Sequence, residues 1–269
     1  MIFMANKNLY LIGTAHIDLK GPQRLEGLLK RISPDIVALE FHRDREFLIE
    51  KRKSVSPEVE EKETDDVLRE VGLNLTPKQR KTMLEGGREI TSIMGYEFTV
   101  CRDYVHANPK LKLKYIDISI FENGVKEFKE GYTVAMKGML AAIAQEPELR
   151  EPFLKTLSKG KKAFLQQSME NVDAIYKNAE MMGELAEFLR DPETFEAMKE
   201  QMPQNAAQAL KQIYNPKRDK AMAHKVNQLY HRGSNKLAVI VGLLHVPGIK
   251  SRMLELEPTV MTLADYDKN

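Results

Sequence analysis

Two histidines and one glutamate follow three separate apolar runs of this sequence. His16 and His245 each stand three residues after a glycine that ends its run, and Glu40 closes another run. A glycine permits a sharp exit from a strand, so that the imidazole can turn back over the strand end. Two neutral imidazoles and one carboxylate are a common ligand set for a catalytic divalent ion, with one position left for water. We therefore predict a metal site formed by His16, His245 and Glu40, with Glu40 as ligand or general base.

Neither the metal nor the metal site follows from these residue types alone. The ligands suit zinc, manganese or cobalt equally. Each histidine, taken singly, is better explained as a helix cap or as a partner for a loop carbonyl. The repeated Gly-x-x-His spacing, together with Glu40, favours a site.

Five apolar runs predict the β-strands that would bring these residues together. They cover Asn8–Gly13, Asp35–Glu40, Leu113–Ile118, Leu237–Gly242 and, more weakly, Thr259–Leu263. The first, second and fourth runs do not alternate with polar residues, which is typical of strands covered on both faces. The carboxyl ends of parallel strands share one sheet edge, where open α/β sheets build their sites. Asp117, which closes the third run, is expected at the same edge.

Helical patterns separate these runs. Pro22 and the apolar residues after it form a helix between the first two strands, which completes a βαβ unit. Phe98, Cys101 and Val105 repeat at helical spacing, so the single cysteine is predicted to be a packing residue. One cysteine also excludes an internal disulfide and a multi-cysteine zinc site.

The predicted fold is α/β, with a central mixed, mostly parallel sheet, flanking helices and a large helical insertion. We divide one composite domain into residues 1–120 and 233–269, which form the α/β core, and residues 121–232, which form the insertion. The methionines of the insertion are expected to fill its helical core. The charged segment Lys51–Asp66 is expected to be a solvated loop or lid.

Two arginines are candidates to support the site. Arg218 shares a helical stripe with Met222 and Val226, so its side chain is expected to point inward. It then needs an acidic or anionic partner, such as Glu40 or a substrate carboxylate. The alternative is that its guanidinium group reaches out to solvent along the apolar stripe. Arg45 follows Glu40 by five residues and is a candidate to pair with it or to bind substrate; a surface position is nearly as consistent. His224 and His231 lie on the polar face of the Arg218 helix and are expected to be exposed.

Composition and charge limit the classes of partner that this protein is expected to bind. The 269 residues include 41 Lys and Arg against 39 Asp and Glu, a net charge of +2. This balance predicts no attraction to nucleic acid or to an anionic membrane, and Lys110, Lys112 and Lys114 are interpreted as a solvated edge. Met1–Lys7 lacks a signal-peptide pattern, and no apolar run reaches the length of a membrane span. We expect a soluble cytoplasmic protein, with a homodimer as one option for its oligomeric state.

Several motifs taken together resemble the TraB/PrgY family. They are Gly13-Thr14-Ala15-His16, Ala38-Leu39-Glu40 with Arg45, Gly95-Tyr96-Glu97, Arg218-Asp219 with Met222-Ala223, and Gly242-Leu243-Leu244-His245 with Gly248-Ile249. The related families are the Tiki membrane metalloproteases, the GumN proteins and, more distantly, erythromycin esterases and ChaN-like proteins. Two features depart from these relatives: Asp117 is followed by Ile118 instead of arginine, and the apolar C-terminal segment of the membrane-anchored members is missing.

The resemblance implies an α/β core with a helical insertion and a metal-dependent peptidase activity. It implies that His16, His245 and Glu40 are essential, with Arg218 and Glu97 in supporting positions. The leading hypothesis is thus a metal-dependent hydrolase whose substrate is a peptide or small molecule. The alternatives are a metal-free, esterase-like hydrolase with a His/Glu pair, and a non-catalytic protein that binds a peptide or small ligand.

Overall fold

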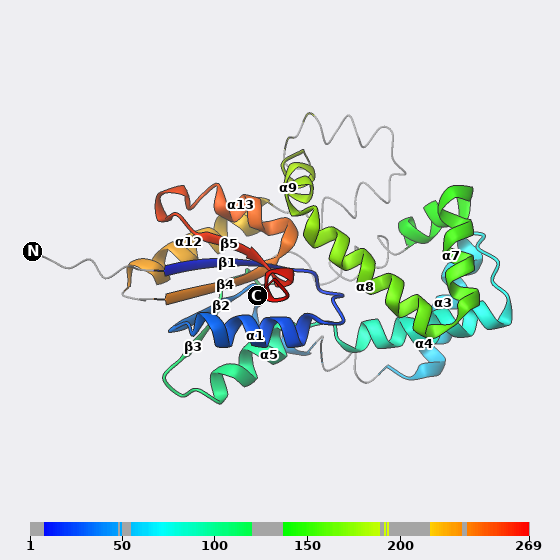
Figure 1. Cartoon of the computed structure of the whole chain (residues 1–269), viewed down its shortest axis with the longest axis horizontal. Helices are drawn as coiled ribbons and strands as arrows, with labels where there is room; N and C mark the ends of the chain where they lie inside the picture. Colours follow the sequence, from blue (N-terminus) through cyan, green and yellow to red (C-terminus); the bar gives the residue numbers. More distant parts are fainter. Residues whose placement is uncertain are drawn as a thin grey trace, which may run out of the picture.

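Five parallel strands form one sheet at the centre of the molecule (Figure 1). The computed structural model describes residues 8–47, 49, 55–119, 137–188, 191, 193, 216–232 and 236–268. The strands are β1 (Asn8–Thr14), β2 (Ile36–Leu39), β3 (Lys112–Tyr115), β4 (Lys236–Gly242) and β5 (Thr259–Thr262), in the order β3-β2-β4-β1-β5. All four pairings between them are parallel. The α/β class is confirmed, and the sheet is wholly parallel across the described residues where the sequence predicted a mixed one.

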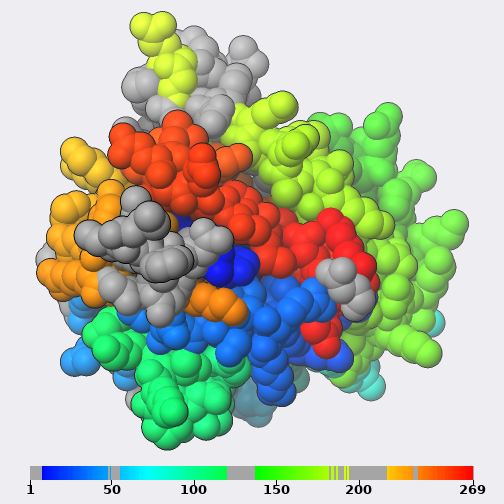
Figure 2. Space-filling view, turned by 60° about the vertical axis from the view of Figure 1, so that its left-hand side comes forward, coloured from blue at the N-terminus to red at the C-terminus, as the bar shows by residue number. Residues whose placement is uncertain are grey.

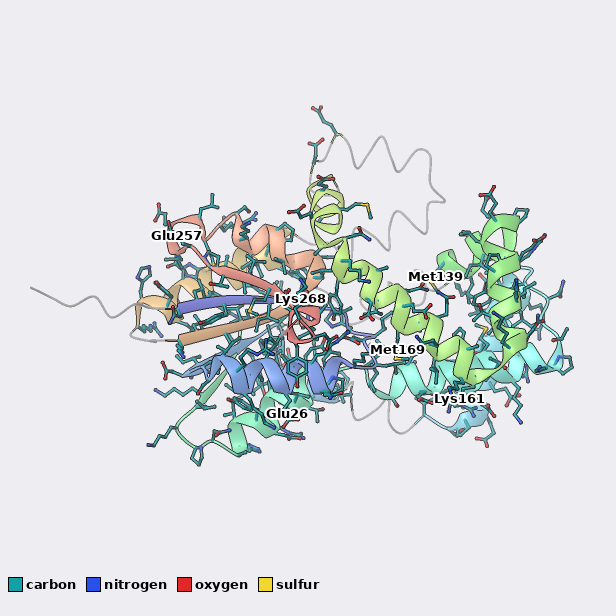
Figure 3. The ribbon with its side chains drawn as sticks, viewed as in Figure 1. Glu26, Met139, Lys161, Met169, Glu257 and Lys268 are labelled. Carbon is teal, nitrogen blue, oxygen red and sulfur yellow. The ribbon has the colours of Figure 1, made fainter. Side chains whose placement is uncertain are left out.

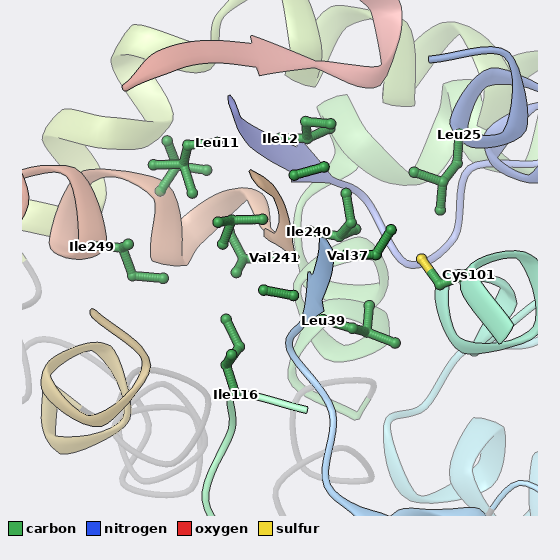
Figure 4. Packing of buried hydrophobic residues seen from close by; sticks show 14 of the residues in the cluster. Leu11, Ile12, Leu25, Val37, Leu39, Cys101, Ile116, Ile240, Val241 and Ile249 are labelled. Atoms are coloured by element: carbon green, nitrogen blue, oxygen red, sulfur yellow. The ribbon is translucent and has the colours of Figure 1, made fainter. Parts of the chain in front are cut away.

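The three apolar strands predicted from the sequence lie side by side in the middle of this sheet. β4 pairs with β1 from Asn8 opposite Lys236 to Thr14 opposite Gly242, and its other edge pairs with β2. Their side chains are buried on both faces, as the lack of polar alternation predicted. Figure 4 shows Leu11, Ile12 and Ile240 among the packed side chains. This placement puts the carboxyl ends of β1, β4 and β2 next to one another.

Helices cover both faces of the sheet (Figure 1). On one face α1 (Gly21–Ile32) packs against α5 (Tyr96–His106), and on the other α12 (Pro216–His231) packs against α13 (Val246–Lys250). Short 3₁₀ turns follow the strands or lie near the C-terminus. They are η1 (Arg43–Arg45), η2 (Leu243–His245), η3 (Leu254–Leu256) and η4 (Leu263–Tyr266).

A helical arm extends from the core, and its helices come from two parts of the sequence. It contains α3 (Pro57–Glu70), α4 (Pro77–Ser92), α7 (Pro147–Lys159) and α8 (Lys161–Lys177), and α9 (Ala179–Phe188) follows. α4 packs on both α7 and α8, and a separate apolar cluster includes Leu68, Leu73 and Leu140. In the space-filling view the green surface of the arm stands beside the red C-terminal segment (Figure 2).

Two expectations for the helical regions were wrong. The segment predicted as a loop is helical from Pro57, because Ser56 caps the first turn of α3 with its side chain and Pro57 suits that turn; Lys51–Ser54 lie outside the described residues. Met139 (labelled in Figure 3) is 58% exposed and Met181 is 59% exposed, so these two methionines of the insertion do not fill a core. Residues 121–136 and most of 189–215 of the predicted insertion are also outside the described ranges.

Across the parts of the chain that the structure describes, every helix is too short or too polar to cross a bilayer.

Cys101 is predicted to be chemically inert in the folded protein. Its side chain is fully buried, and burial raises the pKa of its thiol far above the usual range, so the reactive thiolate is scarce. We expect its reaction with a disulfide reagent such as DTNB to be much slower in buffer than in guanidinium chloride. The matched control is Lys30→Cys on α1, where the native side chain is 66% exposed and the new thiol should react at once. Rapid labelling of Cys101 in the native protein would contradict this packing.

Candidate functional site

The carboxyl ends of four strands meet at one edge of the sheet, and the polar residues of the sequence motifs gather there. Thr14 ends β1, and Glu40 directly follows β2 and continues its pairing, since its N–H donates to the carbonyl of Ile240 at 2.8 Å. Asp117 lies just beyond β3, with its N–H donating to the carbonyl of Phe41 at 3.3 Å. His245 lies in η2, directly after β4.

The carboxylate of Glu40 is the centre of this group. Its Oε2 accepts a hydrogen bond from the backbone N–H of Gly242 at 2.6 Å, and its Oε1 accepts one from Arg218 Nη2 at 2.5 Å. Burial opposes the ionisation of Glu40, but the positive charges of His245, Arg218 and His16 outweigh it and hold the pKa of Glu40 well below its usual range. These neighbours therefore favour the ionised form of the buried Glu40 carboxyl group.

Gly242 makes room for two of these side chains. A Cβ atom at this position would lie 3.1 Å from His16 Nε2 and 3.4 Å from Glu40 Oε2. Both atoms thus approach one point beside the bare glycine backbone, one from the loop after β1 and the other from the end of β2. This close approach is a physical reason for glycine in the second Gly-x-x-His motif.

His245 is held between two carboxylates. Its Nδ1 lies 2.6 Å from Asp219 Oδ1, and its Nε2 lies 3.4 Å from Glu40 Oε1. Both the imidazole and Asp219 are buried, and Asp219 belongs to α12, next to Arg218. Asp219 therefore sets the orientation of the ring and directs Nε2 towards Glu40.

His16 is arranged in the same way at the other side of Glu40. Its Nδ1 lies 2.7 Å from Oε1 of Glu97, in the first turn of α5, and the same oxygen accepts a hydrogen bond from Thr14 Oγ1 at 3.0 Å. The negative charge of Glu97 raises the pKa of His16 to about 9, against the opposing effect of burial. The side chain of His16 is 55% exposed, so water screens part of this attraction and ligands can reach the ring.

The contact between His245 and Glu40 favours a positive charge between these two groups. If the His245 ring donates from Nδ1 to Asp219, a neutral ring turns only the lone pair of Nε2 towards Glu40 Oε1, which lies 3.4 Å away. A proton or a metal ion between the two groups relieves this repulsion. The outer carboxylates Glu97 and Asp219 are the partners that metal-binding histidines ordinarily have.

The donor set therefore fits a divalent ion in its atom types and hydrogen bonding. Within the described ranges no three or more His, Cys, Asp or Glu side chains are arranged to hold a metal ion. The 3.4 Å between His245 Nε2 and Glu40 Oε1 is the distance of an ion pair, and binding of a metal ion by His16, His245 and Glu40 would require these donors to shift.

Arg218 joins Glu40 to a second buried carboxylate, that of Asp117. Its Nε and Nη2 lie 3.1 and 2.6 Å from Oδ1 and Oδ2 of Asp117, and the guanidinium is 11% exposed. Arg45 also contacts Asp117 Oδ2, so its hydrogen bond goes to Asp117 and not to Glu40, the partner that the sequence suggested. Met222 and Val226 are fully buried on the same stripe, which excludes a snorkelling Arg218.

Two tyrosines hold the loop that carries His16: Tyr176, which the sequence analysis did not identify, and Tyr96, which it named only as part of a motif. The hydroxyl of Tyr176, from α8 of the arm, accepts from the N–H of Ala15 at 2.9 Å and donates to Asp18 at 3.2 Å. The hydroxyl of Tyr96 donates to the carbonyl of Ala15 at 3.2 Å. Buried Arg24 extends this network through Asp18 and through Asp173 of α8. The arm therefore takes part in positioning His16.

The structure separates the remaining histidines from this group. His224 and His231 are exposed on α12, as expected. His42 caps η1, and both it and His106 line a separate cavity beside β3. Asp219 and Glu97 were not identifiable as imidazole partners from their own spacing, since they lie 26 and 81 residues from the rings they contact.

The model of the TraB/PrgY/gumN family matches residues 140–258 of this chain. The match contains Arg218, Asp219, Gly242 and His245, whereas His16, Glu40 and Glu97 precede it. In the folded chain the two parts meet at Glu40, whose carboxylate accepts hydrogen bonds from Arg218 and Gly242 of the matched part. Comparisons with curated proteins and with solved structures found no match.

Replacement of Asp117 is expected to destabilise the protein strongly. Asp117→Asn removes a buried negative charge from two guanidinium groups, which costs roughly 3 to 5 kcal/mol in the free energy of unfolding at neutral pH. The pKa of Asp117 is lowered because the pull of Arg218 and Arg45 outweighs burial, so its contribution is complete above about pH 4 and is lost as the pH falls through its folded-state pKa. Urea titrations at several pH values measure both effects.

The control is Asp103→Asn, which removes a 60% exposed carboxylate from its surface pair with Arg102 and should cost less than about 1 kcal/mol. Equal losses in the two variants, or a difference that does not shrink in acid, would contradict the role given to Asp117.

Proposed function

We propose that the group around Glu40 is the active site of a metal-dependent hydrolase that acts on peptides, as the match of residues 140–258 to the TraB/PrgY/gumN family suggests. The observation that supports it most is the placement of two imidazoles on either side of one buried carboxylate, each oriented by an outer carboxylate. A divalent ion near Glu40 would meet two ring nitrogens whose orientations are already fixed by carboxylates.

His16, His245 and Glu40 would hold the ion. A divalent ion in this position supplies a water molecule of lowered pKa and polarises a carbonyl group. Glu97 and Asp219 keep each ring protonated on Nδ1, so that Nε2 is the atom available to the metal. Glu40 is better suited as a ligand than as a general base, since a carboxylate of strongly lowered pKa is a weak proton acceptor.

Arg218 has a separate role in this proposal. Its guanidinium fixes Glu40 and neutralises part of the buried negative charge. It also lies at the strand edge, where a developing oxyanion or a substrate carboxylate would meet its positive charge. The half-exposed ring of His16 marks the side from which a substrate can enter.

A metal-free hydrolase with the same residues is the second candidate. It is favoured by the raised pKa of His16, which makes this imidazole a cation and a proton donor near neutral pH. In that mechanism a water molecule would attack the scissile carbonyl and lose a proton to solvent, His16 would protonate the leaving group, and Glu40 would remain an anion. The two candidates differ in whether activity survives chelation.

Metal content tests the first candidate directly. Protein purified without chelator is expected to carry about one divalent ion per chain by elemental analysis, and His16→Ala and His245→Ala are expected to carry much less. His224→Ala, on the exposed face of α12, is the matched control and should retain the metal. Equally negligible metal in all four proteins, also after incubation with zinc, manganese or cobalt, would reject metal binding by these residues.

Hydrolysis tests the activity itself. We expect cleavage of members of a mixed peptide library, detected by mass spectrometry, and a loss of at least about 100-fold in rate in Glu40→Gln, because one ligand and the central charge are removed. Activity that persists in strong chelator selects the metal-free mechanism. Peptides that bind but are recovered intact after long incubation would instead identify a binding protein.

A further inference from the structure

A cavity lies beside the site, between η1, α5, β3 and α12. Its volume is about 880 Å³, which is enough for several amino-acid residues. Its lining includes His42 and His106, two histidines that do not belong to the Glu40 group.

Positive charge dominates this cavity. Four cationic side chains line it, namely Arg43, Arg102, Lys114 and Lys225, against the single carboxylate of Glu46. Arg102 pairs with Asp103 at 3.0 Å. Arg43, Lys114 and Lys225 form no ion pair with any residue in the described ranges. The chain as a whole is nearly neutral, so this concentration of unpaired cations is local and predicts an anionic ligand.

The cavity also has an apolar wall. Phe98 stacks on Phe41 with ring centroids 4.4 Å apart, and Tyr115 meets Phe41 edge-on at 5.3 Å. Leu113 and Val105 contribute aliphatic surface. A ligand that fits has negative groups and an apolar body. The four cations come from four different elements, which favours anionic groups spread along a chain over one compact anion.

Lys225 connects this cavity to the site. Its Nζ donates to the backbone carbonyl of Asp117 at 2.6 Å, and the carboxylate of the same residue binds Arg218, which binds Glu40. His42 is only two residues beyond Glu40 in the sequence. A chain segment lodged in the cavity would therefore extend from the sheet edge where the Glu40 group lies.

We propose that this cavity binds an acidic, partly apolar peptide segment, which makes acidic peptides the substrate class of the neighbouring site. The assignment of a substrate rests on the proposed function, whereas binding of the acidic segment does not require catalysis.

The test is direct binding of the full chain to a labelled peptide in the presence of chelator. The probe is a fluorescein-labelled ten-residue peptide with four glutamates among leucines and alanines, and its partner has glutamine at the same four positions. By fluorescence anisotropy at low salt we expect the glutamate peptide to bind at least about tenfold more tightly. We expect Arg43→Gln/Lys114→Gln to weaken it by about tenfold, since two charge contacts at a partly exposed site are removed.

The matched control carries the same change of charge outside the cavity. Arg69→Gln/Lys112→Gln removes one arginine that is 79% exposed on α3 and one exposed lysine on β3, and it should bind the glutamate peptide like the unmodified protein. All four altered residues are at the surface or in the cavity rim, and circular dichroism verifies folding of both variants.

Three results would overturn the proposal: equal binding of the two peptides, equal weakening in both double variants, or displacement of the peptide by a short oligouridylate that itself binds more tightly through Arg43 and Lys114. Because chelator is present throughout, failure of metal binding or hydrolysis leaves this measurement intact. Failure of peptide binding, conversely, leaves cleavage of neutral peptides unaffected.

Discussion

The buried negative charge of Glu40 is the constraint around which the carboxyl edge of the sheet is organised. An isolated carboxylate in such a position is costly unless charged and hydrogen-bonding partners surround it. Here they come from four places in the chain: the N–H of Gly242, the guanidinium of Arg218, and the imidazoles of His16 and His245. The low pKa of Glu40 is the measure of how completely these partners offset its desolvation.

Each partner of Glu40 depends in turn on another carboxylate. Asp219 holds His245, Glu97 holds His16, and Asp117 holds the far side of Arg218. This outer layer draws on α5, α12 and the end of β3, so the site is stable only when the layers of the core are assembled. Tyr176 adds the helical arm to this dependence by clamping the loop before His16. Loss of the Tyr176 contact would therefore loosen the loop that carries His16.

The Glu40 group and the neighbouring cavity have complementary electrostatics. The Glu40 group is rich in carboxylates and attracts a cation, whereas the neighbouring cavity is rich in unpaired cations and attracts an anion. Asp117 lies between them, with its carboxylate in the first and its carbonyl bound to Lys225 of the second. A substrate with an amide bond to be cleaved and an acidic segment would place the amide at the Glu40 group and the acidic segment in the cavity. This placement would fix the direction in which the substrate binds.

Apolar runs in the sequence determined the strands, because side chains buried on both faces leave a local signal that needs no tertiary information. The parallel arrangement of such strands also predicted that His16, Glu40, Asp117 and His245 share one edge. Pairings between distant segments leave no such local signal, so only the folded structure decided that Asp219 and Glu97 orient the imidazoles, that Arg45 turns to Asp117, and that every strand pair is parallel. The same reason applies to the arm, where the charged segment that begins α3 was predicted as a loop and where only the folded structure packs α4 on α7 and α8.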